Sequence, residues 1–301
     1  MPRTCSLLRY PGGKTQLYPF INNLLTINRI NGTYIEPFAG GAGVAIKLLL
    51  EKKVERIWIN DYDKSIYSVW YAVLNHPKKL ISLISDVPFD VKGGNMSDEE
   101  NIEYWKFIRV IHDREKNHQN SIMNAFSTLM LNRMNVSGII NGGPIGGFSQ
   151  DKNKLYVRFN KKTLISKIKK INQCKSKIRL TRMDALKMIP IINHDNNSFI
   201  FFDPPYFKQG DTLYMSSFSN NDHLLLSKII IKELSNFNWI VTYDDDENIR
   251  KYYKDLSKKY FYQLNYSANN KNRGKAKELL FSSDNLDIES FYTTKLTEID
   301  K

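Results

Sequence analysis

Residues 33–61, TYIEPFAGGAGVAIKLLLEKKVERIWIND, contain two short apolar stretches that are separated by a glycine-rich turn and a longer run with helical spacing. This pattern predicts a strand over residues 33–37, a helix over residues 43–53 and a second strand over residues 56–60. A strand, a helix and a strand in this order form a βαβ unit, which builds a parallel sheet. The chain is therefore expected to have an α/β fold.

The same rhythm returns in the second half of the chain. Four further stretches are expected strands, namely residues 178–183, 198–202, 239–243 and 279–282. Between the two halves, the sequence shows long amphipathic stretches and a glycine-rich run instead of a strand rhythm. We interpret residues 1–64 and 157–301 as one domain with a shared sheet, and residues 65–156 as a mainly helical insertion.

The chain is strongly basic, which narrows the choice of partners. Its 301 residues include 44 Lys and Arg against 31 Asp and Glu, a formal net charge of +13. This charge favours nucleic acid first and an anionic membrane surface second. Because no apolar run reaches the ~18 residues that span a bilayer and no signal peptide is evident, we expect a soluble, cytoplasmic protein. Cys5 and Cys174 are too few for a disulfide framework or a four-ligand zinc site, and no metal is expected.

The turn after the first strand, Phe38-Ala39-Gly40-Gly41-Ala42-Gly43, lets a ligand approach backbone N–H groups closely. Asn60 and Asp61 follow at the end of the second strand, about 20 residues later, where a carboxylate can accept hydrogen bonds from ribose hydroxyls. A glycine cluster alone is also compatible with a simple tight turn. The correctly placed acid favours nucleoside binding.

The motif Asp203-Pro204-Pro205-Tyr206 directly follows the apolar strand 198–202. Ligands of open α/β sheets sit outside the carboxyl ends of strands, so Asp61 and Asp203 are expected to face one crevice. Asp203 and the Pro204 carbonyl can accept both hydrogens of an aromatic amine, which directs its lone pair toward a methyl donor. Tyr206 offers a ring on which a flat base can stack.

With these motifs in place, the sequence resembles the Dam-type, D12 class adenine-specific DNA methyltransferases. Three motifs in family order carry the resemblance: residues 9–14 (RYPGGK), residues 36–41 (EPFAGG) followed by Asn60-Asp61, and residues 203–206 (DPPY). The resemblance covers about residues 8–282. It implies a Rossmann-like, mixed but mostly parallel sheet, the fold of S-adenosylmethionine-dependent methyltransferases, with a mainly helical DNA-recognition insertion. It also implies methylation of adenine N6 in double-stranded DNA after the base is flipped out.

The resemblance assigns roles to particular residues. It implies that Tyr10, Lys14, Asp61 and Asp203 contact S-adenosyl-L-methionine, and that Asp203 and Tyr206 also hold the adenine. Phe38 and Gly40 complete the expected cofactor site, and Pro204 and Pro205 complete the expected catalytic motif. Without the family, Lys14 reads as a solvated turn residue. Double-stranded DNA is the expected partner, a cognate restriction endonuclease is left open as a second one, and a monomer is expected.

Residues 131–143 resemble the DNA-reading stretch of the same family. We expect DNA contacts from Arg133, Asn135, Ser137 and Asn141, although Arg133 also belongs to the part of the stretch that shapes its scaffold. GATC-methylating members carry Asn and Arg where this chain has Ser137 and Asn141. Because Asn cannot reproduce the bidentate contact of Arg with guanine, the target is not expected to be read as GATC by the same contacts.

Residues 151–182 hold twelve Lys or Arg residues and one acid. This density predicts a surface that follows phosphates, with Lys161 and Lys162 among the contacts, although a solvated helix face is the simpler interpretation. The acidic run Asp244-Asp245-Asp246-Glu247 reads as the start of a helix over residues 248–259 and not as a metal site.

Other functions stay open at this point. Related motifs with Asn in first place serve RNA or protein-glutamine methylation, and enzymes that methylate cytosine N4 more often have Ser before Pro-Pro-Tyr. A non-catalytic DNA-binding module with a methyltransferase fold is the alternative from another class. Asp203 and the order of the motifs favour an enzyme that acts on DNA.

Overall fold

The computed structural model describes residues 4–9, 12–151, 153–193, 195–207, 218–265 and 275–299. The chain divides into two compact units. The first, which we call the sheet unit, comprises residues 1–4, 14–62 and 177–301. The second, the helical unit, comprises residues 5–13 and 63–176.

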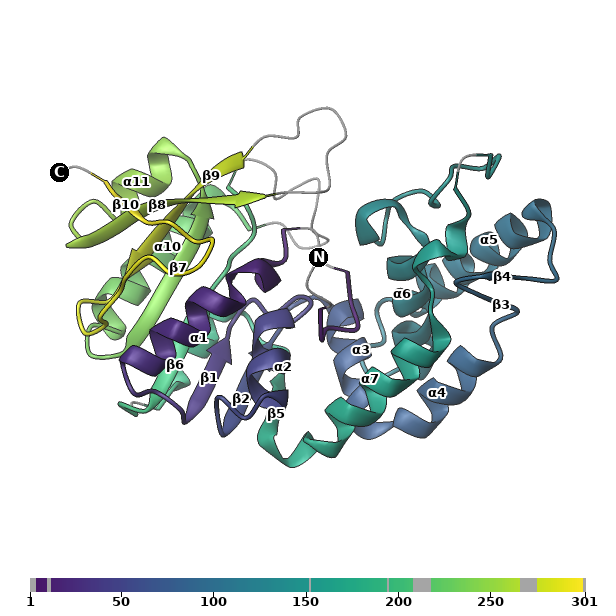
Figure 1. Ribbon diagram of the computed structural model, residues 1–301, viewed down its shortest axis with the longest axis horizontal. Coiled ribbons are helices and arrows are strands. Elements are labelled where there is room, and N and C mark those ends of the chain that lie inside the picture. Colours follow the sequence, from purple (N-terminus) through teal and green to yellow (C-terminus); the bar gives the residue numbers. More distant parts are fainter. Residues whose placement is uncertain are drawn as a thin grey trace. The chain divides into compact units, whose positions relative to one another are not determined.

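The sheet unit is built on one eight-stranded sheet with the order β10-β8-β9-β7-β6-β1-β2-β5 (Figure 1). Its strands are β1 (Thr33–Glu36), β2 (Arg56–Asn60), β5 (Ile178–Thr181), β6 (Ser198–Phe202), β7 (Asn238–Asp244), β8 (Lys258–Asn265), β9 (Lys275–Ser282) and β10 (Thr297–Glu298). The run from β7 to β5 is parallel, whereas β9 pairs antiparallel with β7 and β8, and β10 antiparallel with β8. The fold is therefore Rossmann-like, with a mixed but mostly parallel sheet, as the sequence predicted.

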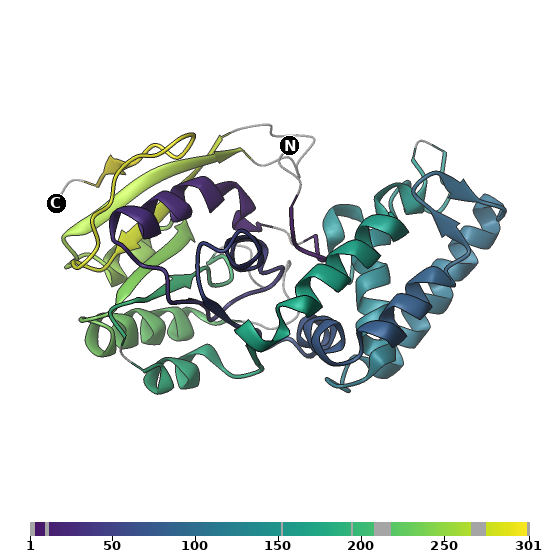
Figure 2. The ribbon, with the colours of Figure 1, turned by 60° about the horizontal axis from the view of Figure 1, so that its bottom comes forward.

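Helices cover both faces of this sheet, with α1 and α2 on one face and α8 and α10 on the other (Figure 2). They are η1 (Lys14–Leu17), α1 (Tyr18–Ile27), α2 (Gly43–Leu50), α8 (Ala185–Met188), η5 (Ile189–Ile191), α10 (Asn220–Glu233) and α11 (Glu247–Tyr252). All five residues of β6 are buried. Parallel strands covered on both faces need this continuous apolar character, which is why SFIFF was readable as a strand.

At the antiparallel end of the sheet, the structure differs from the elements that the sequence predicted. Residues 248–259 were expected to be helical, but α11 ends at Tyr252 and β8 begins at Lys258. β8 and β10 were not predicted. The stretch KKYFYQLN of β8 mixes lysines with aromatic residues, and this polar character hides a strand whose neighbours come from distant parts of the chain. Asp246 does cap α11, since its side chain accepts the Asn248 N–H.

The helical unit consists mainly of helices (Figure 1). Its elements are α3 (Lys64–Asn75), α4 (Pro77–Ser85), the short strands β3 (Phe89–Asp90) and β4 (Gly93–Gly94), α5 (Asp98–Glu115), α6 (Ile122–Met134), η2 (Val136–Gly138), η3 (Leu155–Arg158) and α7 (Lys161–Gln173); η4 (Lys175–Lys177) links it to the sheet unit. Ser97 begins α5 with a capping box, and Ser121 caps α6. Every residue of α6 from Asn124 to Met134 is buried, so α6 forms the centre of this unit.

The boundaries of this unit differ from the expected insertion 65–156. Helix α7 packs on α3 and α4, and so residues up to 176 belong to the helical unit. Residues 5–13 belong to it as well, because Asn132 of α6 accepts the Arg9 N–H at 2.8 Å and donates to the Arg9 carbonyl at 2.7 Å. Such long-range contacts leave no signal in local periodicity. Target recognition by this unit stays a prediction.

No helix within the described ranges is both long and apolar enough to cross a membrane.

Candidate functional site

The ammonium of Lys14 and the carboxylate of Asp203 form an ion pair at the carboxyl end of β6. Lys14 Nζ lies 2.8 Å from Asp203 Oδ1, and the Lys14 side chain is only 2% exposed. Thr242 of β7 donates its hydroxyl to the same oxygen at 3.0 Å. Asp203 follows β6 directly, and β6 lies between β1 and β7, so three neighbouring strand ends surround this carboxylate.

Glu278 of β9 is a second carboxylate at this site, and the sequence analysis missed it. Its Oε2 lies 3.9 Å from Lys14 Nζ and accepts the hydroxyl of Tyr262. Its Oε1 accepts the hydroxyl of Tyr206 at 3.3 Å, while Lys14 donates to Tyr206 Oη at 3.4 Å. The sequence holds one cue to it, a single glutamate at the start of the apolar stretch ELLFS. A charged side chain in a buried strand needs a partner of opposite charge, and so it indicates a site.

Burial and charge act in opposite directions on Lys14. Burial alone would lower its pKa, but the carboxylates of Asp203 and Glu278 outweigh this and raise the pKa well above its ordinary value. Burial raises the pKa of Glu278, and Lys14 opposes that shift. One ammonium thus serves two carboxylates, and the set carries a net charge of −1 when all three groups are ionised.

The glycine turn and Asp61 form one hydrogen-bonded structure. Asp61 Oδ2 accepts the Gly40 N–H at 2.8 Å, and Asn60 O accepts the Ala39 N–H at 2.9 Å. Gly40 and Ala42 have φ angles of 45° and 44°, in the left-handed region that favours glycine. The ends of β1 and β2 are thereby locked together at the edge where ligands of such sheets bind.

Glu36, which precedes this turn, is a buried carboxyl. It is 5% exposed, and its Oε1 accepts the Ala45 N–H at 3.2 Å. Burial raises its pKa to about 8, although the Ala45 hydrogen bond opposes the shift. Glu36 is therefore largely protonated near neutral pH and ties the start of α2 to β1.

The sheet unit brings together most residues predicted for cofactor and catalysis. Lys14 contacts both Asp203 and Tyr206, and Asp61 accepts a hydrogen bond from Gly40. Phe38 makes an edge-to-face contact with Phe218, with ring centroids 5.5 Å apart. Tyr10 lies outside the described residues. Pro204 is buried and Pro205 half-buried in the turn between Asp203 and Tyr206.

Two residues predicted to contact DNA are instead buried in the helical unit. Asn135 accepts the Trp105 indole N–H at 2.7 Å and donates to the carbonyls of Ile139 and Ile140, each at 2.8 Å. The guanidinium of Arg133 donates to the Leu7 carbonyl. Burial and the nearby Arg9 lower the pKa of Arg133 to about 10. In this conformation, Asn135 supports the loop after α6 from inside and Arg133 binds the segment around Leu7, and both side chains are buried.

The loop after α6 does expose other residues. Asn141 is exposed, and so is Val136 at 53%, whereas Ser137 is half-buried with a φ of 56°. A left-handed conformation at a non-glycine residue is often found at functional sites. Gly138 follows with a φ of 80°, and a Cβ there would meet the Arg9 carbonyl at 2.3 Å. Ser137 and Asn141 are thus the predicted DNA-reading residues that this loop can present.

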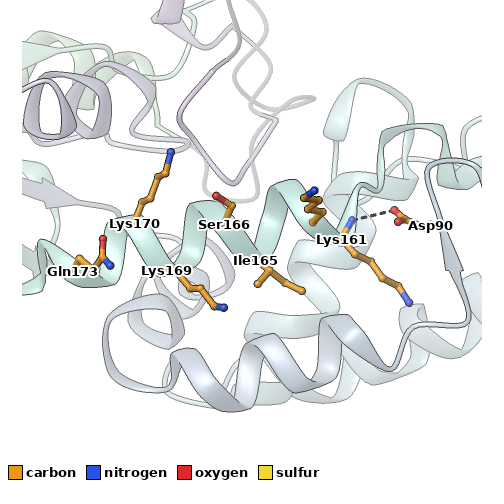
Figure 3. Close-up of a pocket in the computed structure, with 8 residues that line it drawn as sticks. Asp90, Lys161, Ile165, Ser166, Lys169, Lys170 and Gln173 are labelled. Atoms are coloured by element: carbon orange, nitrogen blue, oxygen red, sulfur yellow. Dashed lines mark hydrogen bonds between the residues drawn. The ribbon is translucent and has the colours of Figure 1, made fainter.

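The predicted phosphate-following lysines divide into two groups on α7 (Figure 3). Lys161 Nζ donates to the carbonyls of Ser85 and Val87, and so caps the end of α4. Lys162, Lys169 and Lys170 are exposed, and Figure 3 shows Lys169 and Lys170 pointing away from each other. All four lysines line an open groove of about 710 Å³, together with Asp90, Ile165, Ser166 and Gln173. Only the exposed three are placed to meet phosphates.

One family model matches nearly the whole chain. The family model described as D12 class N6 adenine-specific DNA methyltransferase matches residues 10–289. The chain is 23% identical over 259 residues to the Type II methyltransferase M.MjaIII of Methanocaldococcus jannaschii, covering 84% of this chain and 80% of that one. It is also 23% identical over 266 residues to the Type II methyltransferase M1.LlaDCHI of Lactococcus lactis subsp. cremoris, covering 86% and 80%. Among solved structures, the rRNA methyltransferase aviRa from Streptomyces viridochromogenes matches with a TM-score of 0.33 at 11% identity, over 92% of this chain and 87% of that one.

Proposed function

Since this chain belongs to the D12 class of N6 adenine-specific DNA methyltransferases, we propose that Asp203, Pro204 and Tyr206 hold the adenine amine while S-adenosyl-L-methionine provides the methyl group. The observation that carries this proposal is the fixed orientation of Asp203. Within the described residues, Lys14 and Thr242 both bind its Oδ1. This leaves Oδ2 as the oxygen suited to accept a hydrogen from the amine.

The proposed chemistry depends on two acceptors. The lone pair of an exocyclic amine is conjugated with the ring, and so the amine is a poor nucleophile. When Asp203 Oδ2 and the Pro204 carbonyl accept its two hydrogens, the nitrogen becomes more pyramidal and its lone pair points at the methyl carbon. The carboxylate also stabilises the positive charge that develops on nitrogen. Tyr206 contributes a ring on which the flipped base can stack.

The residues of the sheet unit fit S-adenosyl-L-methionine. A sulfonium carries a positive charge, and the set of Lys14, Asp203 and Glu278 carries a net negative charge when all three groups are ionised. We assign the ribose hydroxyls to Asp61, whose carboxylate is oriented by the Gly40 N–H, and a packing contact to Phe38. When bound, the cofactor supplies an electrophilic methyl group.

The proposed DNA contacts come from the helical unit. Ser137 and Asn141 are assigned to base recognition, and Lys162, Lys169 and Lys170 to phosphates. Because both curated relatives are named Type II methyltransferases, we include a companion restriction endonuclease as a partner of the system. The protein is proposed to act as a monomer in the cytoplasm.

The test is incubation of the full chain with plain duplex DNA and S-adenosylmethionine labelled in its methyl group, followed by chromatography of the nucleosides. Label in N6-methyladenine supports the proposal. Label confined to N4-methylcytosine would overturn the base assignment. If calorimetry shows cofactor binding but no methyl group is transferred to DNA, the alternative of a non-catalytic DNA-binding module would be favoured. Transfer to RNA or protein glutamine under the same conditions would replace DNA as the substrate.

A further inference from the structure

His223 of α10 lies at the centre of an aromatic group that we call the His223 cluster, formed by Phe207, Phe218, His223 and Tyr243. The centroid of its ring lies 4.7 Å from that of Phe218, 5.2 Å from that of Phe207 and 5.4 Å from that of Tyr243. His223 Nδ1 is 2.9 Å from Tyr243 Oη, and the residue is only 1% exposed. The cluster therefore fixes the ring by contacts in several directions and by a hydrogen bond to β7.

Two members of the cluster connect His223 to opposite parts of the candidate site. Phe207 directly follows Tyr206, and its N–H donates to Asp244 Oδ1 at 2.9 Å. Phe218 makes the edge-to-face contact with Phe38 of the glycine turn. A single imidazole thus contacts the residue after the catalytic motif and the residue that packs on the expected cofactor turn.

His223 acts here through its shape and not through its charge. Burial lowers its pKa to about 4, although the carboxylates of Asp222 and Asp246 oppose the shift. The ring is therefore uncharged at neutral pH. A planar, uncharged ring with one hydrogen bond to a tyrosine holds a fixed orientation in an apolar surrounding.

We propose that His223 is a positioning residue for methyl transfer, which sets the relative placement of Tyr206 and Phe38 through Phe207 and Phe218. This inference rests on the proposed function. Methyl transfer depends on the alignment of the amine with the methyl group, and a displacement of about 1 Å from a change outside the reacting groups can cost on the order of 100-fold in rate.

The experiment compares His223→Leu with His223→Phe in the full chain. The leucine variant has no ring at this position, and its kcat is expected to fall by about 10- to 100-fold with an unchanged KM for DNA. Its calorimetric affinity for S-adenosylhomocysteine is expected to fall as well, because Phe38 is no longer supported through Phe218. The phenylalanine variant keeps the ring and is expected to retain most of the parental kcat and affinity.

Leu24→Ala is the matched control for folding. Leu24 lies on α1 and is 1% exposed, and it does not belong to the hydrophobic core that includes Tyr243 and packs against Phe207 and Phe218. This variant is expected to lower the melting temperature and to keep the parental kcat and affinity. Parental kcat and affinity in His223→Leu, or equal decreases in Leu24→Ala, would overturn the inference. If the parent transfers no methyl group, the proposed function fails, while the calorimetry still tests whether His223 supports Phe38.

Discussion

Lys14 Nζ lies 2.8 Å from Asp203 Oδ1, although more than half of the chain separates the two residues in sequence. The lysine is almost fully buried, and its second carboxylate neighbour, Glu278, comes from a third region of the chain. Because Lys14 is shielded from water, its attraction to Asp203 is screened less than that of a surface ion pair. The first two predictions follow from this arrangement.

Asp203→Ala is expected to lower kcat by at least about 100-fold, because the carboxylate that stabilises the developing charge is removed. The fold is expected to survive, since Asp203 lies just beyond the end of β6 and its side chain is 23% exposed, so that no buried core contact is removed. Methyl transfer and circular dichroism measure the two effects. Asp245→Ala is the control, because Asp245 forms a surface pair with Arg250. A variant of Asp203 with near-parental turnover would remove it from the mechanism.

Lys14→Met is expected to destabilise the protein by about 3 kcal/mol, because it leaves two carboxylates without their shared cation. Glu278→Gln in the same chain should recover part of this stability, since one buried negative charge is removed. Urea unfolding of the two single variants and the double variant gives the coupling between the residues. If the two changes in unfolding free energy simply add in the double variant, Glu278 does not interact with Lys14. Calorimetry on Lys14→Met is also expected to show weaker binding of the cofactor.

Glu36 predicts a pH dependence of stability. Its pKa is about 8 in the folded chain and near 4.5 when unfolded, so the folded state binds more protons between these values. Its contribution is fully present below about pH 4.5 and is lost as pH rises toward 8. Between pH 6.5 and 8 the decrease amounts to about 2 kcal/mol. The buried histidines His112 and His223 act in the opposite direction over this range. Burial lowers their pKa to about 4 in the folded chain, whereas unfolded histidine, with a pKa near 6.5, still binds protons at pH 6.5.

The check is urea unfolding at pH 6.5 and pH 8 for the parent and for Glu36→Gln. Because all other titratable groups are the same in both chains, the change in stability from pH 6.5 to pH 8 is expected to differ between them by about 2 kcal/mol, with the larger decrease in the parent. An unchanged slope in the variant would mean that Glu36 is ionised in the folded chain.

The exposed lysines of α7 predict a salt effect. We expect a flatter plot of log DNA affinity against log salt concentration when Lys162, Lys169 and Lys170 are all changed to Gln. The magnitude of its slope should fall by roughly 1–3, about 0.9 for each phosphate that is no longer neutralised. Lys232→Gln, on an exposed part of α10, should leave the slope unchanged. Lys161→Gln should mainly lower the melting temperature, because Lys161 caps α4. A parental slope in the triple variant would identify α7 as a solvated helix.

The exposed residues of the loop after α6 predict that the target is not read as GATC through the contacts that GATC-methylating members use. Single-molecule sequencing of DNA from cells that lack other adenine methylases is expected to show N6-methyladenine in a different sequence context, and methylation confined to GATC would contradict this. Asn141→Ala should reduce discrimination at one base by roughly 1–3 kcal/mol. Asn135→Ala should instead reduce stability, because it removes buried hydrogen bonds.

Local sequence determined the parallel part of the fold and the ends of its strands. The apolar run of β6 followed by Asp203, and the glycine turn followed by Asp61, are signals within a few residues, and ligand sites of parallel sheets lie at those strand ends. Local sequence patterns did not predict β8. An antiparallel strand with lysines and aromatic residues depends on partners that local periodicity does not reveal.

Only the tertiary structure decided which side chains share a charge and which face outward. Glu278 joins Lys14 because β9 pairs with β7 beside the end of β6, and this pairing depends on contacts between distant segments. Asn135 and Asn141 have the same side chain and lie in one loop, yet the first is buried and the second exposed. Burial is set by the packing of the whole unit, and for that reason sequence could name the residues of this site but not assign each of them its role.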